Sequence, residues 1–265
     1  MKICVAGACG RMGRRILELA AASDDIEPAG AFESPERAGA DMTVGQESNR
    51  PVHVHVSGDA EAEIRRGDIL IDFTVAAACV AHTRIAARLR KPVVAGTTGL
   101  SESQRAELTA CAADVPVVFA PNMSVGMNLL FKLVSEAARV LGLEYNVEIV
   151  EIHHNQKKDS PSGTAIRLAE CAAEALGLDA GADAVHGRHG LVGERPARQI
   201  GLHAVRGGDV TGDHMVLFLG KGERIALSHC AHSRDTFAQG ALRAARFALN
   251  APPGLYSMQD VLGLR

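Results

Sequence analysis

Short apolar runs alternate with helical patterns along the first half of the chain, and turn-forming residues separate them. The apolar runs predict strands at 2–6, 29–32, 52–56, 69–73, 92–95 and 117–120. Apolar residues at helical spacing predict helices after residue 13 and at 59–66, 76–90, 101–113 and 124–141. This alternation is typical of a parallel sheet that is covered by helices on both faces.

The pattern changes after residue 141. A strand is expected at 146–152 and a helix at 165–176, followed by a connection at 177–198 without clear periodicity. Three apolar runs then follow without helices between them, at 201–205, 214–219 and 224–229. We expect these runs to form an antiparallel sheet in a second, α+β domain. The last helix, at 234–249, and the tail up to residue 265 fit either domain.

The run at 215–219 is apolar on both faces of the expected strand, which leaves little of this sheet for water. A self-association surface would explain the pattern. A sheet covered by its own helix on one face and by loops on the other explains it equally well.

A glycine-rich turn follows the first strand. Gly7, Gly10 and Gly13 recur at a three-residue spacing between that strand and the next helix. Backbone N–H groups in such a turn can approach a pyrophosphate because no Cβ atoms intervene. Glu33 follows the second strand, about twenty residues past Gly13, where an acidic residue holds a ribose diol. Together these features predict a dinucleotide site.

Three more turns follow expected parallel strands, at 72–74, 96–99 and 120–124. The carboxyl ends of parallel strands meet at one edge of the sheet, so these hydroxyl-rich turns should converge on the same ligand. Ordinary loop chemistry is the alternative for any single turn.

The stretch 151–164 carries the densest chemistry in the chain, because it joins a strand, a polar loop and the start of a helix. Two adjacent histidines, His153 and His154, precede two adjacent lysines, Lys157 and Lys158, and a Ser-Pro-Ser-Gly-Thr helix start. The first N–H groups of a helix carry partial positive charge, the lysines add full charge, and histidines exchange protons near neutral pH. The stretch predicts chemistry on a small anionic substrate, although a solvated surface loop is the simpler reading of any one residue.

The composition is ordinary for a globular protein of 265 residues, with 47% hydrophobic and 22% charged residues. A net charge of −3 without a charged tail argues against a nucleic-acid surface. No apolar run approaches the ~20 residues of a membrane span, and the chain begins directly with a strand rather than a signal peptide. The six cysteines form no C-x-x-C pair, so we expect reduced thiols in a cytoplasmic protein. His186 and His189 lack further ligands nearby, so we expect no metal.

The motifs together resemble the 4-hydroxy-tetrahydrodipicolinate reductase (dihydrodipicolinate reductase) family, and the resemblance covers essentially the whole chain. They occur in the family's order: Gly7-x-x-Gly-Arg-Met-Gly13, Gly96-Thr-Thr-Gly99, Ala-Pro-Asn-Met-Ser124, Glu151-x-His-His154, Lys157-x-Asp-Ser-Pro-Ser-Gly-Thr164 and Ser-His-x-x-x-Ser-Arg234. The block around His153 and Ser162 is specific, whereas the glycine-rich turn alone is not.

The resemblance implies an α/β fold with a Rossmann-type parallel-sheet nucleotide domain and an inserted α+β substrate domain whose sheet is mixed or antiparallel. The nucleotide domain would comprise 1–123 and 235–265, and the substrate and oligomerisation domain 124–234. A homotetramer assembled through the substrate-domain sheets is also implied. The implied reaction is hydride transfer from a nicotinamide to a cyclic dicarboxylate of the diaminopimelate–lysine pathway, with loss of water.

The resemblance also assigns roles to residues at matched positions. His153 and Lys157 would transfer protons, and His154, Lys157, Ser162, Gly163 and Thr164 would bind the substrate. The implied cofactor contacts are Gly7, Ala8, Cys9, Gly10, Arg11, Met12, Glu33, Phe73, Gly96, Thr97, Thr98, Ala120, Pro121, Asn122 and Met123.

The chain departs from many relatives directly after the ribose-binding acid. Ser34 stands where an arginine often receives the 2′-phosphate of NADP, and Glu33 would repel that phosphate. We therefore expect a preference for NADH, although Arg11 and Arg37 could still support NADPH. Asn155 and Gln156 replace residues that are often basic in relatives, which concerns substrate affinity and not the reaction.

Two other functions are compatible with parts of the pattern. One is a two-domain nicotinamide oxidoreductase of the aspartate or homoserine dehydrogenase type, against which the double histidine and the Ser-Pro-Ser-Gly-Thr segment argue. The other is a non-catalytic NAD-sensing regulator, which would not need a proton donor beside an anion site.

Overall fold

The structure, a computed structural model, describes residues 1–46 and 51–264. The chain forms two compact units, one of Met1–Val125 with Arg234–Arg265 and the other of Gly126–Ser233. Among the described residues, no helix combines the length and the apolar character that crossing a membrane requires. All six cysteines are free thiols, of which Cys4, Cys79 and Cys171 are buried.

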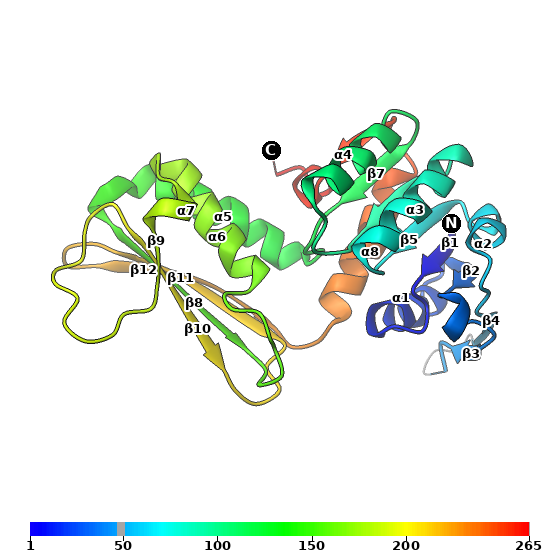
Figure 1. Cartoon of the computed structure of the whole chain (residues 1–265), viewed down its shortest axis with the longest axis horizontal. Coiled ribbons are helices and arrows are strands. Elements are labelled where there is room, and N and C mark those ends of the chain that lie inside the picture. Colours follow the sequence, from blue (N-terminus) through cyan, green and yellow to red (C-terminus); the bar gives the residue numbers. More distant parts are fainter. Residues whose placement is uncertain (47–50, 265) are drawn as a thin grey trace. The chain divides into compact units, whose positions relative to one another are not determined.

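The first unit is built on a six-stranded parallel sheet with the strand order β13-β7-β6-β5-β1-β2. Figure 1 labels β7, β5, β1 and β2 of this sheet. The strands are β1 (Lys2–Ala6), β2 (Glu27–Phe32), β5 (Ile69–Asp72), β6 (Val93–Ala95), β7 (Pro116–Phe119) and β13 (Gly254–Tyr256). The chain moves outward from β1 to β2 and then returns to the other side of β1 at β5. Such a reversal opens a crevice at the carboxyl ends of the strands, where ligands of parallel sheets bind.

Helices cover both faces of this sheet because successive side chains of each buried strand point to opposite sides. Ile3 and Val5 pack toward α1 (Arg11–Ala21), α8 (Asp235–Ala248) and α9 (Met258–Leu262). Cys4 and Ala6 pack toward α2 (Ala60–Arg66), α3 (Ala76–Arg88) and α4 (Glu102–Cys111). The Rossmann-type architecture expected for this part of the chain is therefore confirmed.

One expected strand of this sheet was misplaced. The run at 52–56 forms β4 (Val52–His55), which pairs antiparallel with β3 (Asp41–Val44) in a separate two-stranded sheet. The preceding strand and a short 3₁₀ helix, Pro35–Arg37, were not predicted. The Val-His-Val-His alternation of β4 fits a strand with one exposed face, whereas a central parallel strand is apolar on both faces.

The second unit has a five-stranded sheet with the order β12-β11-β8-β10-β9. Its elements are α5 (Val125–Leu141), a 3₁₀ turn at Gly142–Glu144, β8 (Asn146–His153), α6 (Gly163–Leu176), α7 (Ala180–Asp183), β9 (Ala184–His186), β10 (Ile200–Arg206), β11 (Gly212–Leu219) and β12 (Arg224–Ala231). β11 runs antiparallel to both β8 and β12.

The expectation of a purely antiparallel arrangement was wrong for β10, which runs parallel to β8 and to β9. Helix α6 lies between β8 and these strands in sequence, and it provides the crossover that a parallel pair needs. The sheet is mixed, which is one of the two arrangements that the expected fold class allowed. The connection at 177–198 holds two short elements, α7 and β9, that its irregular pattern did not reveal.

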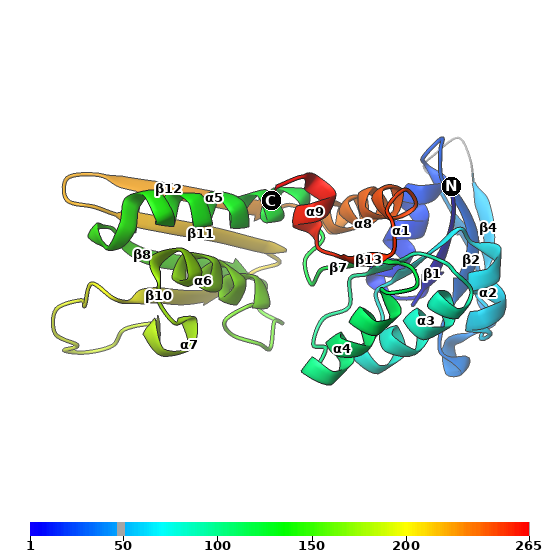
Figure 2. The same cartoon turned by 90° about the horizontal axis from the view of Figure 1, so that it is seen from above.

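Helices α5 and α6 cover one face of this sheet (Figure 2). Val216 and Phe218 point to that face and are fully buried. On the opposite face, Met215 is 40% exposed and Val205 is 46% exposed. Alternate residues of the apolar run at 215–219, Val216 and Phe218, thus pack in the core of this unit, and the others lie on the open face of the sheet.

Candidate active site

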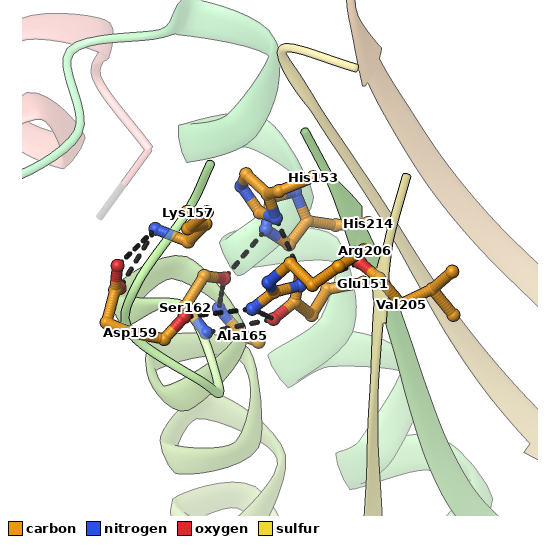
Figure 3. A network of polar contacts seen from close by, with 9 residues as sticks. All are labelled: Glu151, His153, Lys157, Asp159, Ser162, Ala165, Val205, Arg206 and His214. Carbon is orange, nitrogen blue, oxygen red and sulfur yellow. Dashed lines mark hydrogen bonds and ion pairs between the residues drawn. The ribbon is translucent and has the colours of Figure 1, made fainter. Parts of the chain in front are cut away.

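Strand β8 carries Glu151 and His153 on the same face, because residues two apart in a strand point to the same side. This is the face that α6 covers, and both residues are buried, with Glu151 at 0% exposure. In the register of the sheet, Arg206 of β10 lies opposite His153, and His214 of β11 lies opposite Glu151. Three strands therefore bring titratable and charged groups to one point (Figure 3).

The carboxylate of Glu151 is the centre of this polar network (Figure 3). It accepts hydrogen bonds from His153 Nδ1 at 2.5 Å, from both terminal nitrogens of Arg206 at 2.7 Å and from the Ser162 N–H at 3.0 Å. Burial by itself would raise the pKa of Glu151, but these hydrogen bonds outweigh burial and lower that pKa. The carboxylate is therefore ionised at neutral pH.

Burial lowers the pKa of His153, and the positive charges of Lys157 and Arg206 lower it further. The hydrogen bond and the charge of Glu151 oppose this effect only in part. The His153 ring is therefore mainly neutral at pH 7. An ionised carboxylate only accepts hydrogen bonds, so the single proton of the neutral ring resides on Nδ1, and Nε2 keeps its lone pair.

Lys157 lies on the loop after β8, with its side chain 19% exposed. Its ammonium group contacts both carboxylate oxygens of Asp159, at 3.0 and 2.9 Å. Arg206 also donates to the backbone oxygen of Asp159 at 2.9 Å, which ties the loop to β10. The amine of Lys157 is thus held near the buried network while Asp159, 63% exposed, balances its charge.

Ser162 caps helix α6, a role that adds to the substrate contact implied by the family resemblance. Its hydroxyl accepts a hydrogen bond from the Ala165 N–H at 3.1 Å and lies 3.2 Å from His214 Nε2. The side chain is buried, so the hydroxyl holds the helix start in place. Gly163 and Thr164 are the first residues of α6, and Gly163 is exposed with no atom within 4 Å of where a Cβ would lie. An anion can therefore approach these first backbone amides.

His154 follows the end of β8 and is half-buried. Its N–H donates to the Val210 oxygen at 2.8 Å, and its oxygen accepts from the Lys157 N–H at 3.2 Å. The structure thus joins His153 and Ser162 through Glu151 and places His154 and Lys157 on the segment that leads to the same helix.

The expected cofactor residues of the first unit lie where neighbouring parallel strands end. They follow β1, β2, β5, β6 and β7 in turn: Gly7, Ala8, Cys9, Gly10, Arg11 and Met12; Glu33; Phe73; Gly96, Thr97 and Thr98; and Ala120, Pro121, Asn122 and Met123. Because these strands are adjacent and parallel, the five turns share one edge of the sheet.

The glycine-rich turn has the geometry of an anion-binding loop. Gly7 adopts a positive φ of 70°, and its N–H and that of Ala8 donate to the Phe32 oxygen at 3.0 and 3.2 Å. A Cβ on Gly13 would lie 2.2 Å from the Gly7 oxygen, so only glycine allows this close packing of helix and turn. Gly10 caps α1 without a side-chain hydrogen bond, which leaves the helix start available to a phosphate.

The carboxylate of Glu33 lies beside this turn and is 10% exposed. It accepts hydrogen bonds from the N–H groups of Cys9 and Ser34, both at 3.2 Å. Arg37 approaches it to 3.8 Å and donates to the Cys9 oxygen at 3.4 Å. The acidic residue is therefore positioned next to the glycine-rich turn, as a ribose-binding group requires.

Asp72 joins the next two turns; it belongs to the expected ligand-facing turn 72–74 but was not among the expected cofactor contacts. Its fully buried carboxylate accepts hydrogen bonds from Thr74, from the Thr97 hydroxyl at 3.1 Å and from His82 Nδ1 at 2.7 Å. A Cβ on Gly96 would lie 2.2 Å from the Phe73 ring, so these turns are packed tightly. Thr97 is buried in this contact, whereas Thr98 is exposed.

The last of these turns follows β7. The Ala120 N–H donates to the Ala95 oxygen at 3.1 Å, and the Asn122 side chain accepts from the Ser124 N–H at 2.9 Å. Met123 is buried, and Pro121 is exposed. The described residues thus fit a dinucleotide, with a glycine turn, a helix start and a placed carboxylate.

Sequence reasoning missed Glu151, Arg206 and His214 as members of the site. The position of Glu151 two residues before His153 on one strand was a usable signal for a partner on the same face. Nothing local in the sequence connects Arg206 or His214 to His153, because their proximity depends on the register of three strands.

Comparisons with known proteins agree with this geometry. The family model described as dihydrodipicolinate reductase, N-terminus, matches residues 1–123, and the model for the C-terminus matches residues 126–262. A 4-hydroxy-tetrahydrodipicolinate reductase of an Anaeromyxobacter species is 48% identical over 100% of this chain and 98% of its own. A reductase of the same name from Syntrophotalea carbinolica is 46% identical, with 100% of both chains covered.

Among solved structures, the dipicolinate-bound dihydrodipicolinate reductase of a Paenisporosarcina species shares the fold, with a TM-score of 0.76 at 24% identity over 98% of each chain. The family match supports the reductase over the dehydrogenase and regulator alternatives. The two models together account for nearly all of the sequence. The chain belongs to the dihydrodipicolinate reductase family.

Proposed function

We propose that the residues around His153 and Lys157 carry the family's reaction in this chain. The chain is an NAD(P)H-dependent oxidoreductase of diaminopimelate–lysine biosynthesis. It reduces 4-hydroxy-tetrahydrodipicolinate to tetrahydrodipicolinate, and one hydride and one proton enter while one water leaves. Residues 1–123 and 235–265 bind the dinucleotide, and residues 124–234 bind the substrate.

The observation that carries the site assignment is the position of two proton-exchanging groups beside the start of α6. The dicarboxylate is received by Lys157, by His154 and by the amides of Gly163 and Thr164, whose helix start Ser162 holds in place. A lysine and a helix N-terminus are favourable partners for carboxylates. Asp159, which balances the charge of Lys157 in the free protein, gives way to a substrate carboxylate.

Bound NAD(P)H supplies the hydride. Negative charge then develops on the substrate ring, and the ammonium group of Lys157 offsets it. His153 and Lys157 are the groups that deliver the proton, because both can exchange protons and lie on the substrate-binding side of the second unit. The neutral His153 ring gains a proton more readily once two carboxylates lie nearby.

For the cofactor we propose binding at the glycine-rich turn with a preference for NADH. Glu33 already receives the Cys9 N–H, so its carboxylate is directed at the place where the adenosine ribose would lie. A 2′-phosphate there would face this carboxylate, and Ser34 offers no charge to compensate. Arg37, which is 3.8 Å from Glu33, is the residue whose positive charge would reduce the preference for NADH by attracting a 2′-phosphate.

The proposal is tested by following cofactor oxidation with freshly made product of the preceding synthase, using NADH and NADPH in parallel. We expect turnover with this substrate, none with oxaloacetate plus ammonia, and a higher kcat/KM for NADH. A clear NADPH advantage, on the order of tenfold or 1.4 kcal/mol, would refute the cofactor preference. Absence of turnover with either cofactor would refute the reaction.

We further propose a homotetramer that assembles through the open face of the second sheet, and a cytoplasmic location. Met215 and Val205 expose apolar surface on that face, which suits burial against another copy. Sedimentation equilibrium of the wild-type protein should give the mass of four chains of 27.8 kDa. A monomer at micromolar concentration would contradict this assembly.

A further inference from the structure

Glu151 is an ionised carboxylate with 0% exposure, placed between His153 and Arg206. Such a buried ion pair is a poor choice for stability alone, because desolvation offsets most of the attraction between the charges. Replacing such an ion pair by apolar side chains of similar volume is often neutral for stability. The arrangement therefore calls for an explanation in terms of what it does to His153.

We propose that Glu151, held by Arg206, is a positioning residue that fixes the His153 proton on Nδ1 and so presents Nε2 to the substrate. The inference rests on the proposed function in one respect, namely that His153 exchanges the proton of the reaction. Because Nδ1 contacts Glu151 at 2.5 Å, Nε2 lies on the far side of the His153 ring from this carboxylate. Gly212 lies next to that side, since a Cβ there would be 3.0 Å from Nε2, and the missing side chain leaves this nitrogen uncovered.

Arg206 has a second part in the arrangement, which is to limit the effect of Glu151. A bare carboxylate 2.5 Å from Nδ1 would favour the imidazolium and keep the proton on the ring. Both terminal nitrogens of Arg206 bind this carboxylate and neutralise it. The groups that face His153 are thus Glu151 of β8, Arg206 of β10, His214 of β11 and Lys157 of the following loop.

The two partners of one ion pair therefore act on His153 in opposite directions. Loss of the Glu151 charge disfavours the protonated ring, whereas loss of the Arg206 charge favours it. If the ion pair had a purely structural role, loosening it from either side would shift the pKa of His153 in the same direction.

Glu148 offers a matched control on the same strand. It is also a buried carboxylate that is bound by two arginines and a histidine, namely Arg188, Arg195 and His203. It lies three positions before Glu151 along β8, so it points to the opposite face of the sheet, away from His153. Glu148→Gln disturbs an equivalent cluster without touching the site.

The experiment compares pH profiles of kcat/KM for the wild-type enzyme, Glu151→Gln, Arg206→Gln and Glu148→Gln. We expect Glu151→Gln to lose roughly tenfold or more in kcat with little change in KM. We also expect the limb of its pH profile that reports the titration of His153 to shift to lower pH. Arg206→Gln should shift the same limb to higher pH, and Glu148→Gln should leave it unchanged. An unmoved limb in Glu151→Gln, equal shifts in both site variants or a shifted control would overturn the proposal.

A second readout does not depend on turnover. Nitrogen-15 NMR of labelled histidines, with the His153 signal identified from a His153→Gln sample, reports which ring nitrogen carries the proton. We expect the Nδ1–H form in the wild-type protein and loss of that preference in Glu151→Gln. An Nε2–H form in the wild type would overturn the positioning role. An inactive wild type with the Nδ1–H form would instead refute the proposed reaction while keeping the positioning.

Discussion

His153→Gln and Lys157→Ala are each expected to lose roughly 10²–10⁴-fold in kcat while the fold survives, which is the usual effect of removing a positioned proton donor. Glutamine keeps the size and the polarity of His153 but cannot gain or release a proton near pH 7. Alanine at Lys157 removes both a proton source and the charge that offsets negative charge on the substrate ring. Steady-state kinetics with the synthase product measure both losses.

Lys158→Ala is the matched control for the lysine. Lys158 neighbours Lys157 in sequence and is exposed, so its removal changes the net charge of the loop by the same amount. We expect its kcat to stay close to that of the wild type. Near-wild-type turnover in both His153→Gln and Lys157→Ala would contradict the role assignment, provided that circular dichroism shows all variants folded.

The first unit was predictable from the sequence because its strands are apolar on both faces and its helices are regularly spaced. Runs such as 69–73 and 92–95 gave β5 and β6 within a residue or two at either end. The pairing of β3 with β4 was not predicted, because β3 has no strong hydrophobic pattern of its own. The parallel direction of β10 was not predicted, because an apolar run does not indicate whether the neighbouring strand is parallel or antiparallel.

The candidate site was predictable only where its residues are close in sequence. His153, Lys157 and Ser162 fall within one strand–loop–helix junction, so the local composition was enough to mark this segment as a candidate site. Arg206 and His214 join them through strand pairing, which a single sequence does not reveal. The carboxylate that connects both sets, Glu151, lies within the junction but was given no role.

Strand β8 thus carries two buried carboxylates with opposite tasks, Glu151 toward the site and Glu148 toward the open face of the sheet. The Glu148 cluster ties the loop between β9 and β10 to the sheet, because Arg188 and Arg195 belong to that loop. Gly201 of β10 makes room for it, since a Cβ there would lie 1.8 Å from a carboxylate oxygen of Glu148. Glu148 is therefore a candidate for the main electrostatic support of the second unit.

Glu148→Ala is expected to destabilise the second unit by roughly 3–5 kcal/mol at pH 7, because it leaves two partly buried arginines without their carboxylate. A suitable probe exists, since the chain has two tyrosines and no tryptophan. In a Tyr256→Phe background, Tyr145 reports by fluorescence on unfolding of the second unit in urea. Protein concentration is held constant, because subunit association adds to stability.

The control is Glu136→Ala, whose carboxylate also pairs with two cations, Lys132 and Arg139, but is 45% exposed. Solvent screens an exposed pair, so this variant should unfold close to the wild type. Equal losses in Glu136→Ala and Glu148→Ala would contradict the special weight given to the buried cluster.

The Glu148 cluster also predicts how the difference in unfolding free energy between the wild type and Glu148→Ala changes with pH. Burial by itself would raise the pKa of Glu148, but hydrogen bonds from Arg188, Arg195 and His203 outweigh burial and lower the pKa from 4.5 to about 2. A lowered pKa gives stability that is fully present above pH 4.5 and is lost as the pH falls toward 2, with a total on the order of 3 kcal/mol. The gap between the wild type and Glu148→Ala should therefore narrow between pH 5 and pH 2. A gap that stays constant over this range would show that Glu148 stabilises the unit through packing and not through its charge.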